Sequence, residues 1–67
     1  MITPTMDDIG KYVIYKKWTE DEIEGIIKSI NKRWTVAYVT YHYNNDPYNY
    51  QNYTGAGTKC EDLVFKK

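Results

Sequence analysis

The sequence has few of the residues that enzymes use for catalysis. It contains one cysteine (Cys60), one histidine (His42), one serine (Ser29) and one arginine (Arg33) among 67 residues. A nucleophilic triad would need these single residues to converge, and their spacing matches no known triad motif. No two histidine or cysteine residues stand at the spacing of zinc ligands. We therefore expect a protein that is not an enzyme and that binds no metal or other cofactor.

Disulfides, membrane spans and a secretion signal are also missing. A lone cysteine cannot form an internal disulfide, which agrees with a reducing cytoplasm. Because Glu61 and Asp62 follow it, Cys60 is expected to pack in the interior rather than react as a thiolate. The apolar runs are too short to span a bilayer. The N-terminal segment MITPTMDDIG lacks the basic and apolar regions of a signal peptide.

An excess of positive charge is absent too. Nine basic and nine acidic side chains give a formal net charge of zero. Proteins that hold nucleic acid non-specifically usually carry a basic excess, because phosphate contacts dominate their affinity. Non-specific nucleic-acid binding is therefore disfavoured. The net charge does not exclude local basic patches at Lys16–Trp18 and at Lys32–Trp34. The simpler interpretation is that these residues are solvated strand ends and turns.

Leucine is scarce, which limits the core of this single small domain. The chain has seven isoleucines, four valines and one leucine. A domain of this length lies near the lower limit for folding without disulfides or metals. We therefore expect Trp18, Trp34, Phe65 and some tyrosines to help fill the interior.

Short strand patterns separated by turns predict an all-β domain. The expected strands are Lys11–Lys16, Trp34–Tyr43, a short strand or bend at Thr54–Thr58, and the end of Glu61–Phe65 after a turn. The expected turns are Asp7–Gly10 and Asn31–Arg33, and Asn44–Asn52 is expected to be a loop because it is rich in Asn, Asp and Pro. In the longest strand, alternation places Val39 on the face that points inward and Tyr38 and His42 on a half-exposed face.

The segment Thr19–Ile30 fits two structures. Thr19 with Glu22 matches a capping box, and isoleucines at 23, 26, 27 and 30 have helical spacing. Against a helix stands Gly25, which costs roughly 1 kcal/mol inside one. The part Glu24–Asn31 also fits a strand that ends in a turn. The local pattern slightly favours a helix.

A resemblance favours the strand. The pieces DDIGKYVIY, EGIIKSIN, WTVAYVTY and GTKCEDLVF together resemble a group of small phage and prophage proteins, mostly of unassigned function. Such sequences are similar to SH3-like and Tudor-like small barrels. The resemblance implies a five-stranded antiparallel SH3-like barrel with a short helical turn at the ED-L segment before the last strand. The chain departs from the group at Cys60, where many relatives have proline, and in the long insert Asn44–Tyr53.

Six of the eight tyrosines lie between Tyr38 and Tyr53. Tyr48, Tyr50 and Tyr53 stand in a polar stretch with no aliphatic neighbours to pack against. Exposed aromatic clusters mark contact surfaces, and tyrosine supplies contact area at a small entropy cost. We therefore place a binding site on the insert. Its candidate residues are Tyr43, Asn45, Tyr48, Tyr50 and Tyr53, with Lys16, Trp18 and Arg33 from neighbouring loops.

Three functions compete for this site. The first is a phage-type accessory or counter-defence protein that binds a host or phage protein through the tyrosine-rich loop, in the cytoplasm of a bacterial host cell. The second is an oligomer that sequesters a nucleotide immune signal between subunits. The third is a barrel that binds single-stranded nucleic acid by stacking aromatic side chains on bases. We also expect a homodimer, because a small sheet has edges that are hard to protect.

Overall fold

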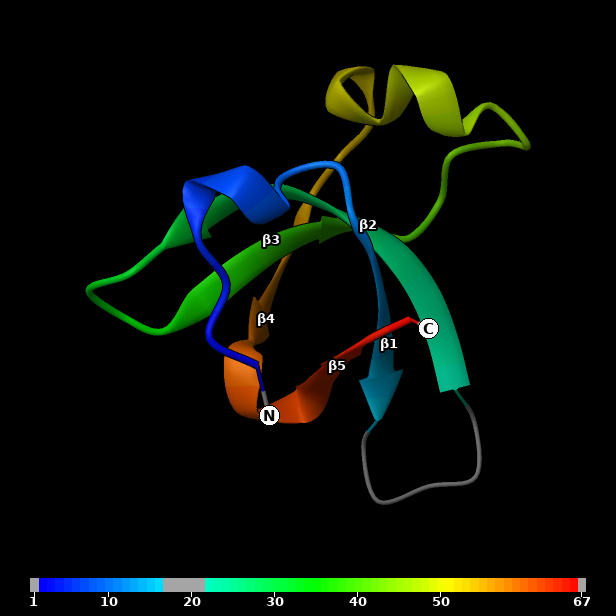
Figure 1. Cartoon of the computed structure of the whole chain (residues 1–67). Helices are drawn as coiled ribbons and strands as arrows, with labels where there is room; N and C mark the ends of the chain where they lie inside the picture. The colour runs from blue at the N-terminus through cyan, green and yellow to red at the C-terminus, as the bar shows by residue number, and fades with distance from the viewer. Residues whose placement is uncertain (1, 17–21, 67) are drawn as a thin grey trace.

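Five antiparallel strands form one sheet in the computed structural model, which describes residues 2–16 and 22–66 (Figure 1). The strands are β1 (Tyr12–Lys16), β2 (Glu22–Asn31), β3 (Val36–Thr40), β4 (Ala56–Lys59) and β5 (Leu63–Phe65). The three 3-10 turns are η1 (Met6–Asp8), η2 (Pro47–Asn52) and η3 (Cys60–Asp62). The strand order is β4-β3-β2-β1-β5. The all-β prediction is confirmed, but no ladder within the described ranges joins β4 to β5, so the sheet is open.

The segment that fitted two structures is a strand from Glu22 onward; residues 17–21 lie outside the described part of the chain. The first half of β2 pairs with β1, from Glu22 opposite Lys16 to Ile26 opposite Tyr12. The second half pairs with β3. Each ladder joins β2 to the strand next to it in the chain, and these two ladders outweigh the local helical spacing of the isoleucines. The helical interpretation is therefore wrong for this strand.

A single cluster of buried side chains forms the core on the inner face of the sheet. Its members come from four strands, from η3 and from the N-terminal segment: Ile2, Val13, Ile27, Ala37, Val39, Cys60 and Leu63. Ile9, Tyr15, Ile30 and Tyr41 pack against them. The prediction that Cys60 packs in the interior is confirmed, as is the inward orientation of Val39.

Two aromatic residues expected in the core lie largely outside it. Trp34 is 65% exposed and Phe65 is 37% exposed. Phe65 ends the last strand, where the core no longer covers it, and Lys11 lies over its ring. Trp34 belongs to the turn between β2 and β3. The expectation for Trp34 and Phe65 was therefore wrong, and Trp18 lies outside the described residues.

The strand expected at Trp34–Tyr43 is shorter at both ends. It starts at Val36, because Thr35 has a left-handed backbone with φ of 49°. It ends at Thr40, and the chain then turns away through Asn44 and Asn45, which are also left-handed. Asparagine tolerates this conformation, whereas a β-branched residue such as threonine adopts it rarely.

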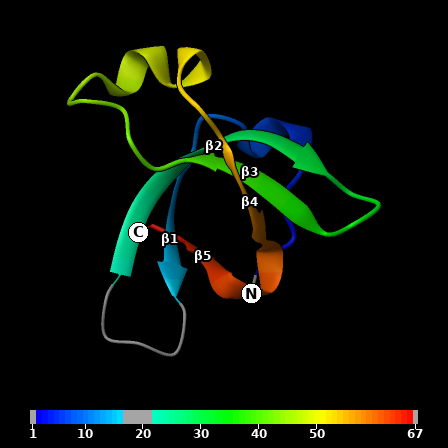
Figure 2. The ribbon, with the colours of Figure 1, turned by 180° about the vertical axis from the view of Figure 1, so that it is seen from behind.

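The other face of the sheet is partly covered by η2. Ile26 and Thr40 lie opposite each other in the ladder between β2 and β3, and both are buried although Ile26 lies outside the main cluster. The Thr40 hydroxyl donates a hydrogen bond to the Tyr50 carbonyl oxygen, 3.1 Å away in η2. Figures 1 and 2 both show η2 above the end of β3 and the middle of β2. The expected loop therefore contains a 3-10 helix that serves as a cover.

Candidate functional site

The insert between β3 and β4 is fixed to the sheet by hydrogen bonds. The Lys28 ammonium donates to the Tyr53 carbonyl oxygen at 2.6 Å, and the Gln51 amide donates to the Lys28 carbonyl oxygen at 3.1 Å. Lys28 has no partner in the β2–β3 ladder, because the register shifts between Ile27 and Ser29, and this leaves its carbonyl oxygen available to Gln51. Together with the Thr40 bond, these contacts hold both the middle and the end of the insert. The tyrosine-rich loop therefore presents its side chains from a fixed backbone.

The start of the insert is organised by its own polar residues. The Asp46 backbone N–H donates to the Tyr43 carbonyl oxygen at 2.6 Å, which closes a turn over Asn44 and Asn45. The Asn49 side-chain amide donates to the Asp46 carboxylate at 2.6 Å. Pro47 occupies the first turn of η2, where its fixed φ favours a helical start. Asn49 and Pro47 therefore help to give this segment a defined backbone conformation.

The three tyrosines of the insert differ in their surroundings. Tyr48 is 94% exposed, whereas Tyr50 and Tyr53 are half-buried. A Cβ at Gly10 would lie 3.1 Å from the Tyr50 hydroxyl oxygen, so the Tyr50 ring end lies directly against this glycine. Gly10 has φ of 93°, a conformation that suits glycine. The expectation that all three tyrosines lack packing partners was therefore wrong for Tyr50.

Tyr43 and Asn45 complete the part of the predicted site that the fold brings together. Asn45 is exposed in the left-handed turn, and Tyr43 is half-buried. Desolvation, followed by the nearby negative charge of Glu24, raises the pKa of the Tyr43 phenol. Tyr43 therefore remains a neutral hydrogen-bond donor at neutral pH.

The remaining predicted site residues do not join this group. Arg33 lies in the turn between β2 and β3, and the views in Figures 1 and 2 place that turn at a different corner of the molecule from η2. Lys16 ends β1 opposite Glu22, at the other end of the sheet from η2. Trp18 lies outside the described residues. The fold thus separates Lys16 and Arg33 from the tyrosine-rich loop.

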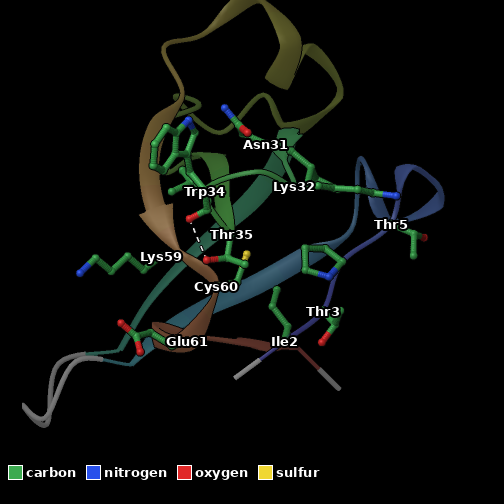
Figure 3. Close-up of a pocket in the computed structure, with 13 residues that line it drawn as sticks. Ile2, Thr3, Thr5, Asn31, Lys32, Trp34, Thr35, Lys59, Cys60 and Glu61 are labelled. Carbon is green, nitrogen blue, oxygen red and sulfur yellow. Dashed lines mark hydrogen bonds between the residues drawn. The ribbon is translucent and has the colours of Figure 1, made fainter.

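A groove at the Arg33 corner was not foreseen from the sequence. It has a volume of about 780 Å³ and lies between the N-terminal segment, the β2–β3 turn and η3 (Figure 3). Trp34 stands on its rim, and the Arg33 guanidinium lies 5.4 Å from the centre of the Trp34 ring. The run Lys32-Arg33-Trp34 was a signal for this site, but Trp34 had been assigned to the core.

Groups that could hold a metal ion or act as nucleophiles are sparse in this structure. No cluster of three or more His, Cys, Asp or Glu side chains occurs among residues 2–16 and 22–66. Burial raises the pKa of the Cys60 thiol, which favours its neutral form. Burial also raises the pKa of Tyr41, whose hydroxyl lies 2.8 Å from that of Thr58. These groups are suited to packing and hydrogen bonding.

Comparisons with known proteins give no family for this chain. No family model matches it, and neither a curated protein nor a solved structure is significantly similar. In the described ranges, no helix is both long and apolar enough to cross a membrane.

Proposed function

We propose that this chain is a non-enzymatic protein-binding module with an SH3-like small-barrel architecture. Support for the architecture comes from the strand order β4-β3-β2-β1-β5 and from η3, a short helical turn immediately before β5. The sequence resemblance implied the same turn at the same place. The bend of β2, which is shared between two ladders, also suits a small barrel.

The main support for a binding role is that Tyr48 is exposed on a backbone that hydrogen bonds hold in place. Its side chain is 94% exposed, while hydrogen bonds from Thr40, Lys28 and Gln51 hold the rest of the insert on the sheet. Because the backbone of the insert is already held, binding needs to order only the Tyr48 side chain, and large aromatic residues often dominate interface energies. We assign Tyr48 as the central contact, with Asn45 and Tyr43 beside it.

The proposed partner is a host or phage protein in the cytoplasm of a bacterial cell. This part of the proposal rests on the resemblance to small phage proteins, which favours an accessory or counter-defence role. A convex loop with one projecting tyrosine suits docking into a pocket on another protein. It suits enclosing a small nucleotide or stacking against several bases less well, so the protein partner is preferred over those two alternatives.

The experiment compares alanine variants of Tyr48, Tyr50 and Tyr53 in two measurements. Partner capture from bacterial lysate is quantified by mass spectrometry, and the melting temperature is measured for each purified variant. Tyr48→Ala should lose capture, with a cost of about 2 kcal/mol or more in binding free energy and almost no change in melting temperature. Tyr50→Ala should lower the melting temperature because its ring packs on Gly10.

Met6→Ala provides a matched control, because Met6 is a large apolar residue that is 65% exposed outside the loop. It should leave both capture and melting temperature unchanged. If Tyr48→Ala captures the same proteins as the wild type, the tyrosine-rich loop is not the binding site. If all three tyrosine variants unfold alike, the tyrosines of the insert are structural.

A further inference from the structure

The groove at the β2–β3 turn is a second surface, built from segments that the tyrosine-rich loop does not include. One wall is the N-terminal segment, held in place by a hydrogen bond of 3.1 Å from the Ile2 N–H to the Cys60 carbonyl oxygen. The opposite wall is the turn itself, held by a bond of 3.0 Å from the Cys60 N–H to the Thr35 carbonyl oxygen. Cys60 therefore ties both walls together through its backbone.

The floor of this groove is aliphatic. Its lining includes Ile2, Pro4 and Cys60, which are buried, and Ile30 and Val36, which are half-buried. These side chains offer a surface that fits a branched or long apolar side chain. A volume of about 780 Å³ falls within the usual range for sites that take a ligand of several residues or a small molecule.

The rim carries mostly positive charge. Lys32 extends across the groove toward Thr5, whereas Trp34 and Lys59 lie on the other side, with the Lys59 ammonium pointing away from the groove (Figure 3). Arg33 does not line the groove, but its guanidinium lies against the Trp34 ring at the rim. Glu61 is the one acidic residue among those that line the groove. Among the described residues that line the groove, two basic side chains and one acidic side chain leave an excess of one positive charge.

The backbone of the turn keeps Trp34 outside the core. Thr35 adopts a left-handed conformation that costs roughly 1 kcal/mol or more for a β-branched residue. The Cys60 backbone N–H donates a hydrogen bond to the Thr35 carbonyl oxygen, and the Thr35 hydroxyl donates to the Trp34 carbonyl oxygen at 2.7 Å. Strain of this kind persists only where surrounding contacts hold it, and it is common at binding sites.

We propose that this groove binds a short acidic peptide segment that carries one large apolar side chain. The apolar side chain contacts the aliphatic floor and Trp34, and carboxylates on either side approach Lys32 and Arg33. An aliphatic floor suits a leucine or isoleucine side chain better than a nucleotide base, which has no aliphatic group to bury. This site is independent of the tyrosine-rich loop, so either proposal can fail alone.

The test is an NMR titration of the ¹⁵N-labelled full chain with defined probes. The first probe is a capped pentapeptide of four glutamates around a central leucine. The second replaces the leucine by glycine, the third replaces the glutamates by lysines, and the fourth is adenosine monophosphate. The readouts are the indole N–H signal of Trp34, assigned with a Trp34→Phe variant, and the backbone amides of Lys32 and Cys60. Only the first peptide should shift these signals strongly, and added salt should weaken its binding.

Matched variants separate charge from packing. Trp34→Ala should lower the affinity for the first peptide by about thirtyfold, and Lys32→Gln should lower it by about fivefold. Lys66→Gln is the charge control, because Lys66 pairs with Glu24 and does not line the groove; its affinity should stay within about twofold of wild type. The Trp34 side chain is 65% exposed, so its truncation should leave a folded spectrum, and Lys32→Gln tests the site independently.

Three results would overturn the proposal. Equal binding of the glycine peptide would show that charge alone attracts the probe. A shift of the Trp34 indole signal with adenosine monophosphate but not with the leucine peptide would make the groove a nucleotide site. A shift of the same signal with protein concentration alone would make it a contact between copies of this chain.

Discussion

Gly25 of β2 lies so close to Val39 of β3 that a Cβ on Gly25 would overlap the Cγ1 atom of Val39. The same Cβ would lie 2.8 Å from Cδ1 of Tyr41 and 3.0 Å from the Thr40 carbonyl oxygen. Gly25 stands where β2 passes from its ladder with β1 to its ladder with β3. The absence of a side chain is what lets the two strands approach at this point.

Gly25→Ala should therefore destabilise the protein by about 1–3 kcal/mol, the range for overpacking a filled interior. Urea unfolding followed by tryptophan fluorescence measures the change. Gly57→Ala is the matched control in β4, because a Cβ there would meet nothing closer than 3.5 Å. Gly57→Ala should change stability by less than about 1 kcal/mol. Equal effects of the two substitutions would contradict the close approach at Gly25.

Thr40→Val should loosen the tyrosine-rich loop. Valine keeps the shape of threonine but removes the hydroxyl that donates to the Tyr50 carbonyl oxygen. The expected cost is about 1–2 kcal/mol of unfolding free energy. Hydrogen exchange should also accelerate in η2 more than in β1. Thr54→Val, at an exposed position, is the control and should leave both unchanged. Unaltered exchange in η2 after Thr40→Val would show that this bond does not hold the loop.

Cys60 should react slowly with iodoacetamide in the folded protein. Its side chain is 6% exposed, and burial raises its pKa above the unfolded value. Folding therefore favours the neutral thiol. The free energy of unfolding is therefore unaffected by this thiol below the pKa of an unfolded cysteine, about 8.5. It decreases as pH rises from there through the higher pKa of the folded state, because only the unfolded protein ionises readily in that range.

Two measurements check this statement. Alkylation at pH 8 should be much faster in urea than in buffer. The melting temperature of the wild type should fall more between pH 8 and pH 10 than that of Cys60→Ala, after each is compared with its own value at pH 7. A Cys60 that is alkylated at the same rate with and without urea would show that the η3 region opens readily.

The chain should form a homodimer in solution. The sheet is open between β4 and β5 within the described ranges, and unpaired strand edges favour association. Light scattering coupled to size-exclusion chromatography should give about twice the chain mass of 8.0 kDa. A mass of one chain from micromolar to millimolar protein would rule out the dimer.

Part of the candidate site could be predicted from the sequence. The Asn and Pro content between residues 44 and 52 predicts an irregular, polar segment, and such a segment leaves an aromatic residue like Tyr48 exposed. The sequence did not distinguish Tyr48 from Tyr50, because Gly10, the residue that Tyr50 packs on, is 40 positions away. It also missed the groove, whose walls are residues 2–5, 30–32, 34–36 and 59–61. Contacts between segments so distant in sequence leave no local pattern.

By itself, the sequence determined the short strands, the turn at Asp7–Gly10 and a turn before β5, because these depend on local turn chemistry and apolar alternation. The acidic residues after Cys60 predicted its interior position, and the resemblance implied that the turn before β5 is helical. Only the tertiary structure decided that residues 22–31 form a strand. It also decided that Thr40 is buried beneath η2 and that Trp34 points outward. The physical reason is the same in each case. Ladders with other strands and covers from other segments change which surface is removed from water, and that burial outweighs local propensity.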